Sequence, residues 1–347
     1  MKYLSLFSGI GAFEKALKNL EISYDLVGYS EIDKYASKSY SQIHNTPESM
    51  NLGDITKINE KELPQVDLIT YGFPCQDISI AGKQKGFESN GEKTRSGLFF
   101  DAVRIIKYCK PKIAIAENVK NLVSKRFKNE FKTVLNSLDE IGYNSYWKIL
   151  KASDFGIPQE RERVFIVSIR KDMDDGKFEF PQCNKNAKTI KDFLDEEVDE
   201  KFYLSKEKIE KINNSNFAQE KKRIQDMNSN CSTLLARDYK CPKCIRIGNI
   251  YGDNIGSGYA GNVWSKFGTS PTLTTAQGGN RQVMIVETEE KVRKLTPCEY
   301  WKLMGFTEED IKKTTCSNTQ LYKQAGNSIV VNVCMALFDK IFDNIKL

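Results

Sequence analysis

The chain has 347 residues, of which 40% are hydrophobic and 28% charged, with a net charge of +6. This is ordinary for a globular protein of about two domains, and no run approaches the ~20 apolar residues of a membrane span. A single histidine, His44, excludes histidine-rich metal sites, and nine cysteines are an odd number that does not suggest a disulfide framework. Without a signal-peptide pattern after Met1, we expect a cytoplasmic protein with no membrane partner.

The chain opens with a predicted strand at 2–7, a turn containing Gly9 and Gly11, and a helix to residue 20. Such a turn lets the backbone approach a nucleotide closely, although many turns of this kind only pack a helix on a strand. The third glycine of the dinucleotide pattern is missing, and Phe13 fills that region. The turn therefore favours a mononucleoside-type ligand.

A second strand is predicted at 26–30 and a helix at 34–43, with Glu31 between them. An acidic residue there suits the two hydroxyls of a ribose, and the alternative is a carboxylate that stabilises the start of the helix. Asp54 follows a glycine in a loop. Asp54 could accept a hydrogen bond from an exocyclic amine of a base, or it could form a turn.

The predicted strand 67–71 leads into Gly72-Phe73-Pro74-Cys75. Ligands and catalytic groups of open α/β sheets lie at the carboxyl ends of strands, so Cys75 is a candidate nucleophile. The alternative is a small buried apolar residue, as most free cysteines are. The polar stretch 80–97 predicts a long loop that could close over the thiol, and a helix is predicted at 98–109.

Further strands are predicted at 112–116, 146–150 and 164–169, with a helix at 131–141. Glu117 follows the first of these strands, at the sheet edge where we expect Cys75. Arg161 and Arg163 precede the last.

The composition changes between residues 171 and 185, where we place a domain boundary. Two helices are predicted at 190–194 and 206–212, followed by a region of loops and short strands at 228–282. Residues 218–286 carry nine Lys or Arg against four Asp or Glu, which fits a surface that faces phosphates or a solvated loop with chance bias.

Three local patterns complete this half of the chain. Cys241 and Cys244 have zinc-ribbon spacing, but nothing else in the sequence completes four ligands, so no metal is predicted. Thr296, Pro297 and Glu299 predict a capped helix start. Residues 324–331 open a last apolar helix that runs to 342.

These motifs in this order resemble the DNA cytosine-5 methyltransferase family, and most closely its single-chain bacterial and phage members. The matching motifs are Phe7-Ser-Gly-Ile-Gly, Glu31-Ile-Asp, Gly53-Asp, Gly72-Phe-Pro-Cys-Gln, Glu117-Asn-Val, Gln159-Glu-Arg-Glu-Arg, Arg293-Lys-Leu-Thr-Pro and Gln324-Ala-Gly-Asn-Ser. The resemblance implies an α/β fold, a Rossmann-like S-adenosylmethionine-dependent methyltransferase sheet with a smaller, loop-rich target-recognition domain. It further implies a catalytic and cofactor-binding part at 1–175, the recognition domain at 176–290, and a return to the catalytic domain at 291–347.

The resemblance also implies roles for single residues. Cys75 would add to C6 of a flipped cytosine, Glu117 would protonate N3, and Arg163 with Arg161 would hold O2 and a nearby phosphate. A cysteine suits this chemistry because it has appreciable thiolate at neutral pH. The implied contacts to S-adenosylmethionine are Phe7, Gly9, Gly11, Glu31, Ile32, Asp54, Pro74, Asn327 and Ser328. The implied DNA contacts are Ser79, Lys83, Gln84, Arg237, Thr272, Thr274 and Arg281.

Two alternatives remain open. One branch of the family methylates transfer RNA with the same motifs, but the sizeable basic recognition domain favours double-stranded DNA. A catalytically idle DNA-binding protein on this scaffold would have a damaged Cys, Glu or Arg, and all three are present. We expect a monomer that acts in restriction–modification or phage modification, with a cognate restriction endonuclease, if there is one, acting separately.

Overall fold

The computed structural model describes most of the chain at residue level. The described residues are 1–74, 88–89, 92–93, 95–183, 188–213, 246–249, 261–276, 281–288 and 291–344.

The chain divides into two compact units. The first unit comprises Met1–Leu150, Glu162–Gln182 and Val333–Leu347, and the second comprises Lys151–Arg161 and Cys183–Asn332. The last residues therefore belong to the unit in which the chain began. The predicted functional division at residues 175 and 290 stays a prediction.

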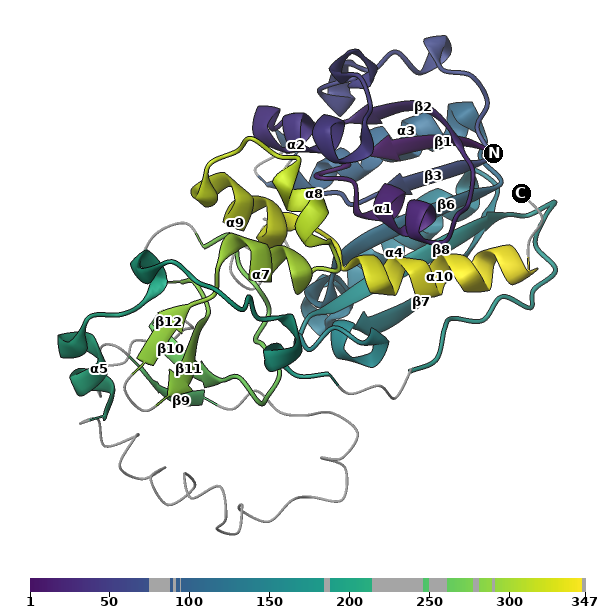
Figure 1. Cartoon of the computed structure of the whole chain (residues 1–347). Coiled ribbons are helices and arrows are strands. Elements are labelled where there is room, and N and C mark those ends of the chain that lie inside the picture. Colours follow the sequence, from purple (N-terminus) through teal and green to yellow (C-terminus); the bar gives the residue numbers. More distant parts are fainter. Residues whose placement is uncertain are drawn as a thin grey trace. The chain divides into compact units, whose positions relative to one another are not determined.

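A six-stranded mixed sheet forms the centre of the first unit, in the order β2-β1-β3-β6-β8-β7 (Figure 1). The strands are β1 (Lys2–Leu6), β2 (Asp25–Ser30), β3 (Leu68–Tyr71), β6 (Ile113–Val119), β7 (Tyr143–Lys151) and β8 (Glu162–Arg170). β1 pairs in parallel with β2 and β3, and β3 pairs in parallel with β6, whereas β8 runs antiparallel to β6. This is the expected α/β methyltransferase-type sheet.

Helices lie on both faces of this sheet, as the alternation of side chains along β1 shows. Leu4 and Leu6 pack in one apolar cluster with α3 (Phe99–Cys109) and α4 (Lys128–Glu140). Tyr3, which points to the opposite face, donates a hydrogen bond to Glu14 of α1 (Ala12–Asn19). On that face, Tyr40 of α2 (Lys34–His44) also donates to Glu14. Each large apolar side chain fully buried in these layers contributes about 1.5–3 kcal/mol to stability.

The predicted elements of the first unit are present with shifted ends. α4 begins at Lys128 rather than at residue 131, and β7 begins at Tyr143 rather than at residue 146. Within the predicted loop 80–97, the structure describes an antiparallel pair of two-residue strands, β4 (Glu88–Ser89) and β5 (Glu92–Lys93).

The second unit contains a four-stranded sheet of short strands in the order β12-β11-β10-β9 (Figure 1). Its strands are β9 (Arg246–Asn249), β10 (Asn262–Ser265), β11 (Met284–Thr288) and β12 (Lys291–Lys294), and its helices are α5 (Lys206–Asn213), α7 (Pro297–Lys302), α8 (Glu308–Lys312) and α9 (Asn318–Asn327). Within the region 228–282, which we expected to consist of loops and short strands, the described residues contain β9 and β10, and residues 228–245, 250–260 and 277–280 lie outside the described residues. The helix predicted at 190–194 is a single 3-10 turn, Ile190–Phe193.

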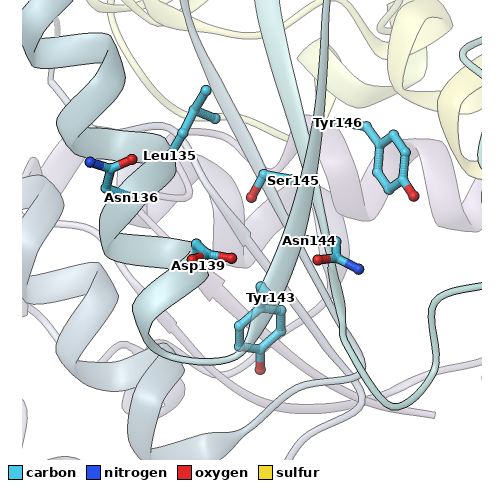
Figure 2. Close-up of a pocket in the computed structure, with 7 residues that line it drawn as sticks. All are labelled: Leu135, Asn136, Asp139, Tyr143, Asn144, Ser145 and Tyr146. Carbon is cyan, nitrogen blue, oxygen red and sulfur yellow. The ribbon is translucent and has the colours of Figure 1, made fainter. Parts of the chain in front are cut away.

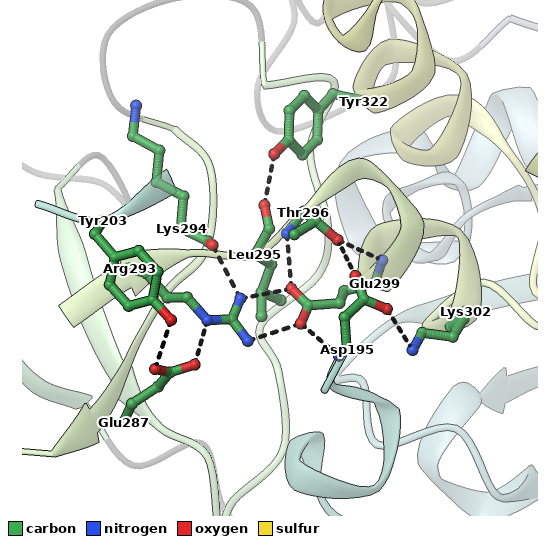
Figure 3. A network of polar contacts seen from close by, with 10 residues as sticks. All are labelled: Asp195, Tyr203, Glu287, Arg293, Lys294, Leu295, Thr296, Glu299, Lys302 and Tyr322. Carbon is green, nitrogen blue, oxygen red and sulfur yellow. Dashed lines mark hydrogen bonds and ion pairs between the residues drawn. The ribbon is translucent and has the colours of Figure 1, made fainter. Parts of the chain in front are cut away.

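A buried ionic network ties β12 to α7 in the second unit (Figure 3). Arg293 is fully buried and donates from both terminal nitrogens to the Glu299 carboxylate, each at 2.8 Å, and from Nε to Glu287. Burial works against the charged guanidinium, but these hydrogen bonds outweigh it and raise the pKa of Arg293. Glu299 also completes the predicted capping box with Thr296, which is thereby confirmed.

The last helical stretch is divided, in contrast to the single helix predicted from residue 324 onward. α9 ends at Asn327 and α10 (Val331–Asn344) begins after a short gap, because Ser328 is extended with φ −72° and ψ 165°. Of the residues that the structure describes, only the stretch Asn318–Asp343, which contains α9, the gap and most of α10, is long and apolar enough to cross a membrane, and 50% of its apolar window is buried in the protein. Core helices of soluble proteins have the same property.

Candidate active site

Four parallel strand ends define one edge of the first sheet. Ser30, Leu6, Tyr71 and Ala116 form one row across β2, β1, β3 and β6. The next residues along these strands are Glu31, Phe7, Gly72 and Glu117. Four motifs that are distant in sequence therefore end at the same sheet edge, as the sequence predicted.

Glu31 is held in place by the turn that follows β1. Its Oε2 accepts from the Gly9 N–H at 2.9 Å, and its Oε1 accepts from the Asp33 N–H at 2.7 Å. The cap of α2 is Asp33, which accepts from Tyr35 and Ala36. Glu31 accepts from the N–H of this capping residue, so the ribose-binding role and the alternative of a carboxylate that stabilises the start of the helix both stay open. Burial raises the pKa of Glu31, although the backbone hydrogen bonds oppose this.

The two glycines of the first turn have different surroundings. Both have positive φ, 57° at Gly9 and 79° at Gly11. A Cβ at Gly9 would meet nothing within 4 Å, whereas a Cβ at Gly11 would overlap the His44 ring of α2. Gly9 thus leaves room for a ligand, while Gly11 satisfies a packing requirement. The cofactor role of Gly11 stays a prediction.

Features around this turn fit an adenosine-type group. Ile32 is an apolar side chain that is 77% exposed beside Glu31. Phe7 adopts a left-handed conformation with φ 53° and packs in part on the core. Asp54 caps a turn by accepting from Thr56, which lowers its pKa and matches the turn-forming alternative. Pro74 is half-buried at the end of the described loop.

Glu117 and Arg163 form an ion pair between neighbouring strands. Arg163 Nε lies 3.1 Å from Glu117 Oε1, and both side chains are mostly buried. The antiparallel register of β6 and β8 brings them together, because Val119 is opposite Arg163 and Glu117 is opposite Phe165. The pairing of these two predicted residues depends on the direction of β8, which the sequence did not specify.

Asn118 is a functional candidate that sequence reasoning missed. Its side chain is 2% exposed and donates to the Phe73 carbonyl at 3.0 Å. It therefore fixes the loop that leads toward Cys75 against the end of β6. The sequence contained a signal for this contact. Asn118 lies at the end of an apolar strand, and a buried amide side chain there needs a hydrogen-bond partner. Cys75 itself lies outside the described residues.

Arg161 belongs to the second unit and is 4% exposed. Its guanidinium donates to three backbone carbonyls, those of Leu273, Gly326 and Ser328. The fully buried Gln159, another residue that sequence reasoning passed over, donates to the Leu303 carbonyl and accepts from the Leu273 N–H. The contact of Arg161 with the base stays a prediction.

The remaining predicted residues differ in exposure, and some of them lie outside the described residues. Thr272 donates to the Glu160 carbonyl at 2.6 Å, Thr274 is half-buried, and Arg281 is exposed. Asn327 and Ser328 end α9 in the second unit, the first exposed and the second buried. Ser79, Lys83, Gln84 and Arg237 lie outside the described residues, as do Cys241 and Cys244.

A surface pocket of about 360 Å³ lies elsewhere in the first unit, between α4 and β7 (Figure 2). Its lining is formed by Leu135, Asn136, Asp139, Tyr143, Asn144, Ser145 and Tyr146. No predicted site residue contributes to it. Among the described residues, no group of three or more His, Cys, Asp or Glu side chains could hold a metal ion.

Comparisons with known proteins agree on one family. The model of the C-5 cytosine-specific DNA methylase family matches residues 1–343. The type II methyltransferase M.HhaI of Haemophilus parahaemolyticus is 35% identical over 96% of this chain and 91% of its own. The orphan methyltransferase M.SPRI of Bacillus phage SPR is 32% identical over 98% of this chain and 97% of its own. The crystal structure of S. pombe Dnmt2 methyltransferase shares the fold, with a TM-score of 0.68 at 20% identity over 99% of this chain and 98% of that one.

Proposed function

Because the chain belongs to the C-5 cytosine-specific DNA methylase family, we propose that it transfers a methyl group from S-adenosylmethionine to C5 of a cytosine within a short duplex sequence. The observation that carries this proposal is the Glu117–Arg163 ion pair at the carboxyl edge of the sheet, beside the strand that leads into Gly72-Phe73-Pro74-Cys75. Addition to C6 of cytosine requires an acid, a guanidinium and a thiol, and here the first two are paired on neighbouring strands while the thiol follows β3 in the sequence.

In this proposal Cys75 starts the reaction. The target cytosine must leave the duplex for C6 to be reached. The Cys75 thiolate forms a bond to C6, the C5–C6 double-bond electrons form a new double bond between C4 and C5, and the C4–N3 double-bond electrons take up the proton that Glu117 gives to N3. Arg163 donates to the cytosine O2 and keeps the Glu117 carboxyl oriented. After C5 has received the methyl group, loss of its proton to solvent restores the C5–C6 double bond and expels the Cys75 thiolate, and N3 returns its proton to Glu117.

Members of this family use S-adenosylmethionine, which when bound supplies an electrophilic methyl group. The proposed contacts are the Glu31 carboxylate to the ribose hydroxyls, Phe7 and Ile32 to the adenine ring, and the open backbone at Gly9 to the methionine part. The exposed Ile32 and the space at Gly9 support this assignment. Asp54, Gly11, Pro74, Asn327 and Ser328 complete the proposed set.

We propose residues 176–290 as the part that selects the DNA sequence. The strands that the structure describes there are short, which suits a region whose connecting side chains read base edges. The proposed enzyme acts as a cytoplasmic monomer on DNA of the nucleoid. It takes part in restriction–modification or phage modification, and any cognate endonuclease works as a separate protein.

The test is transfer of labelled methyl from S-adenosylmethionine to unmethylated genomic DNA, with base-resolution sequencing for 5-methylcytosine. Methylation confined to one short motif would support the proposal and identify the recognition sequence. Binding of the cofactor without transfer to DNA would contradict it, and transfer RNA would then be the next substrate to test.

A further inference from the structure

The single histidine of the chain, His44, ends α2 and contacts the turn that follows β1. Its Nε2 lies 3.0 Å from the Ile10 carbonyl oxygen. A carbonyl oxygen can only accept a hydrogen bond, so Nε2 carries a hydrogen and is the donor. The ring lies directly against Gly11, because a Cβ at that residue would overlap it. The proposed reaction uses no histidine, so this contact needs another explanation.

α2 packs on α1 in a way that aims His44 at this turn. Tyr40 is fully buried and donates to Glu14 of α1 at 3.0 Å, and its ring stacks on that of Tyr29 with 3.9 Å between the ring centroids. His44 follows Tyr40 by one helical turn on the same face of α2, and their ring centroids are 4.8 Å apart. Because Ile10 also lies four residues before Glu14, these two contacts together fix the turn against α2.

The segment 31–44 holds the dipeptide Gly9–Ile10 at both of its ends. Glu31 Oε2 accepts from the Gly9 N–H at 2.9 Å, and His44 Nε2 donates to the Ile10 carbonyl. Gly9 is also the residue at which a Cβ would meet nothing within 4 Å. Glycine has more backbone freedom than any other residue, so a turn built on it keeps one shape only where its neighbours fix it. The contact with His44 supplies one of the two restraints.

We infer that His44 is a positioning residue for S-adenosylmethionine, whose Nε2–H holds the turn at residues 9–11 in the shape that receives the methionine part. The inference rests on the proposed function, which assigns the open backbone at Gly9 to that part of the cofactor. A turn that is already ordered avoids the entropy cost of ordering when the ligand binds. The contribution of His44 should therefore concern the amino-acid end of the ligand and not its nucleoside, which is assigned to Glu31 and Ile32.

The first test compares two ligands by calorimetry, S-adenosylhomocysteine and methylthioadenosine, which keeps the nucleoside but lacks the amino-acid end. His44→Phe keeps a ring beside Tyr40 but has no donor, so S-adenosylhomocysteine should bind about 5- to 10-fold more weakly, as expected for one lost hydrogen bond. Affinity for methylthioadenosine should change less than about twofold. Glu31→Gln is the contrasting variant, because both ligands carry the ribose and both should bind it more weakly. An equal loss for both ligands in His44→Phe would overturn the inference.

A matched pair of variants separates the hydrogen bond from the packing of the ring. The side-chain nitrogen of Gln reaches about as far from the backbone as the Nε2 of His, whereas that of Asn is shorter by one methylene group. His44→Gln should therefore bind S-adenosylhomocysteine within about twofold of the wild type, while His44→Asn should resemble His44→Phe. Equal affinities of the Gln and Asn variants would reject the inference.

The third test uses only the wild type and so does not depend on how a variant folds. Because His44 is the only histidine, nitrogen-15 labelling of histidine in the untagged protein gives one imidazole to observe by NMR. At about pH 8.5, where a free imidazole is neutral, the Nε2–H tautomer should predominate. The Nδ1–H tautomer would overturn the inference, since Nε2 could then not donate to Ile10. If the wild type binds no S-adenosylhomocysteine, the proposed function fails, whereas equal binding by the wild type and His44→Phe removes only this inference.

Discussion

Arg163 Nε lies 3.1 Å from Glu117 Oε1, across the antiparallel pair formed by β8 and β6. Arg163→Lys keeps the positive charge but loses the fork that can serve both the carboxylate and the cytosine O2. Removing one oriented donor from a site of developing charge typically costs about 10²- to 10³-fold in kcat. We expect a loss of this size in single-turnover methyl transfer, with cofactor affinity unchanged. Arg170→Lys, at the other end of β8, is the control, and an equal loss there would contradict the assignment.

Cys75→Ala should abolish methyl transfer and leave DNA binding intact. No other group in the proposed reaction can form the bond to C6, so a loss of about 10³-fold or more is expected. Filter transfer assays and gel-shift titrations measure the two properties separately. Cys183→Ala replaces an exposed cysteine of the second unit and should behave like the wild type. Full activity of Cys75→Ala would reject the mechanism.

Glu31→Gln should weaken cofactor binding. The amide has a donor where the carboxylate has an acceptor, so it conflicts with either the Gly9 or the Asp33 N–H and with one ribose hydroxyl. Hydrogen bonds to charged groups contribute about 1.5–3 kcal/mol, which corresponds to about 10- to 100-fold in the dissociation constant. Calorimetry with S-adenosylhomocysteine measures it. Equal affinities for Glu31→Gln and for Glu21→Gln, an exposed control on the loop after α1, would argue against the ribose assignment.

Gly11→Ala and Gly9→Ala should differ in stability. Both place a Cβ at positive φ, which costs about 1–2 kcal/mol. Only at Gly11 does the new methyl group overlap His44, and overpacking of this kind costs about 1–3 kcal/mol more. Urea unfolding of the ligand-free protein should therefore rank Gly11→Ala below Gly9→Ala. Equal free energies of unfolding would show that the space around Gly11 adjusts at no cost.

Much of this arrangement follows from local sequence signals. The strand ends that carry Glu31 and Glu117 were predicted because apolar runs stop where polar residues begin. The Thr296–Glu299 capping box was predicted because a cap depends on residues three apart. Signals of this range need no knowledge of tertiary structure.

The hydrogen bonds from Arg161 to the carbonyls of Leu273, Gly326 and Ser328 could not be predicted from the sequence. Ser328, for example, is 167 residues away from Arg161. The resemblance therefore assigned Arg161 to the base, while its described hydrogen bonds go to backbone carbonyls. Similarly, the gap between α9 and α10 depends on the Val331 N–H, which donates to the Met304 carbonyl rather than within a continuous helix. Apolar periodicity alone does not reveal such a break.

Glu14→Gln should change how stability depends on pH. Burial raises the pKa of Glu14 above its ordinary value, although hydrogen bonds from Ser5, Tyr40 and Tyr3 oppose this. For a raised carboxyl pKa, the stabilising contribution is complete below the unfolded pKa and is lost as pH rises through the folded one. The amide of the variant would accept the same tyrosine hydrogen bonds without ionising.

The free energy of unfolding of the wild type and of Glu14→Gln is measured from pH 4.5 to 8. The advantage of Glu14→Gln over the wild type should grow with pH, at about 1.4 kcal/mol for each unit by which the pKa is raised. The neighbouring Tyr3, Tyr24 and Tyr40 have pKa values above this range and stay neutral. Parallel curves for wild type and variant would show that Glu14 is not held as a neutral acid. Glu21→Gln serves as the exposed control.

The ring of Phe13 in α1 lies 5.9 Å from the ring of Phe338 in α10, so the first and last helices of the chain pack together in the first unit. Translation proceeds at about 5–20 residues per second, and more than 300 residues separate these two rings in the sequence. The apolar side of α1 therefore cannot pack against α10 until the residues between the two helices have been synthesised. A nascent chain arrested before α10 would expose this surface, which makes it a candidate binding site for chaperones during synthesis.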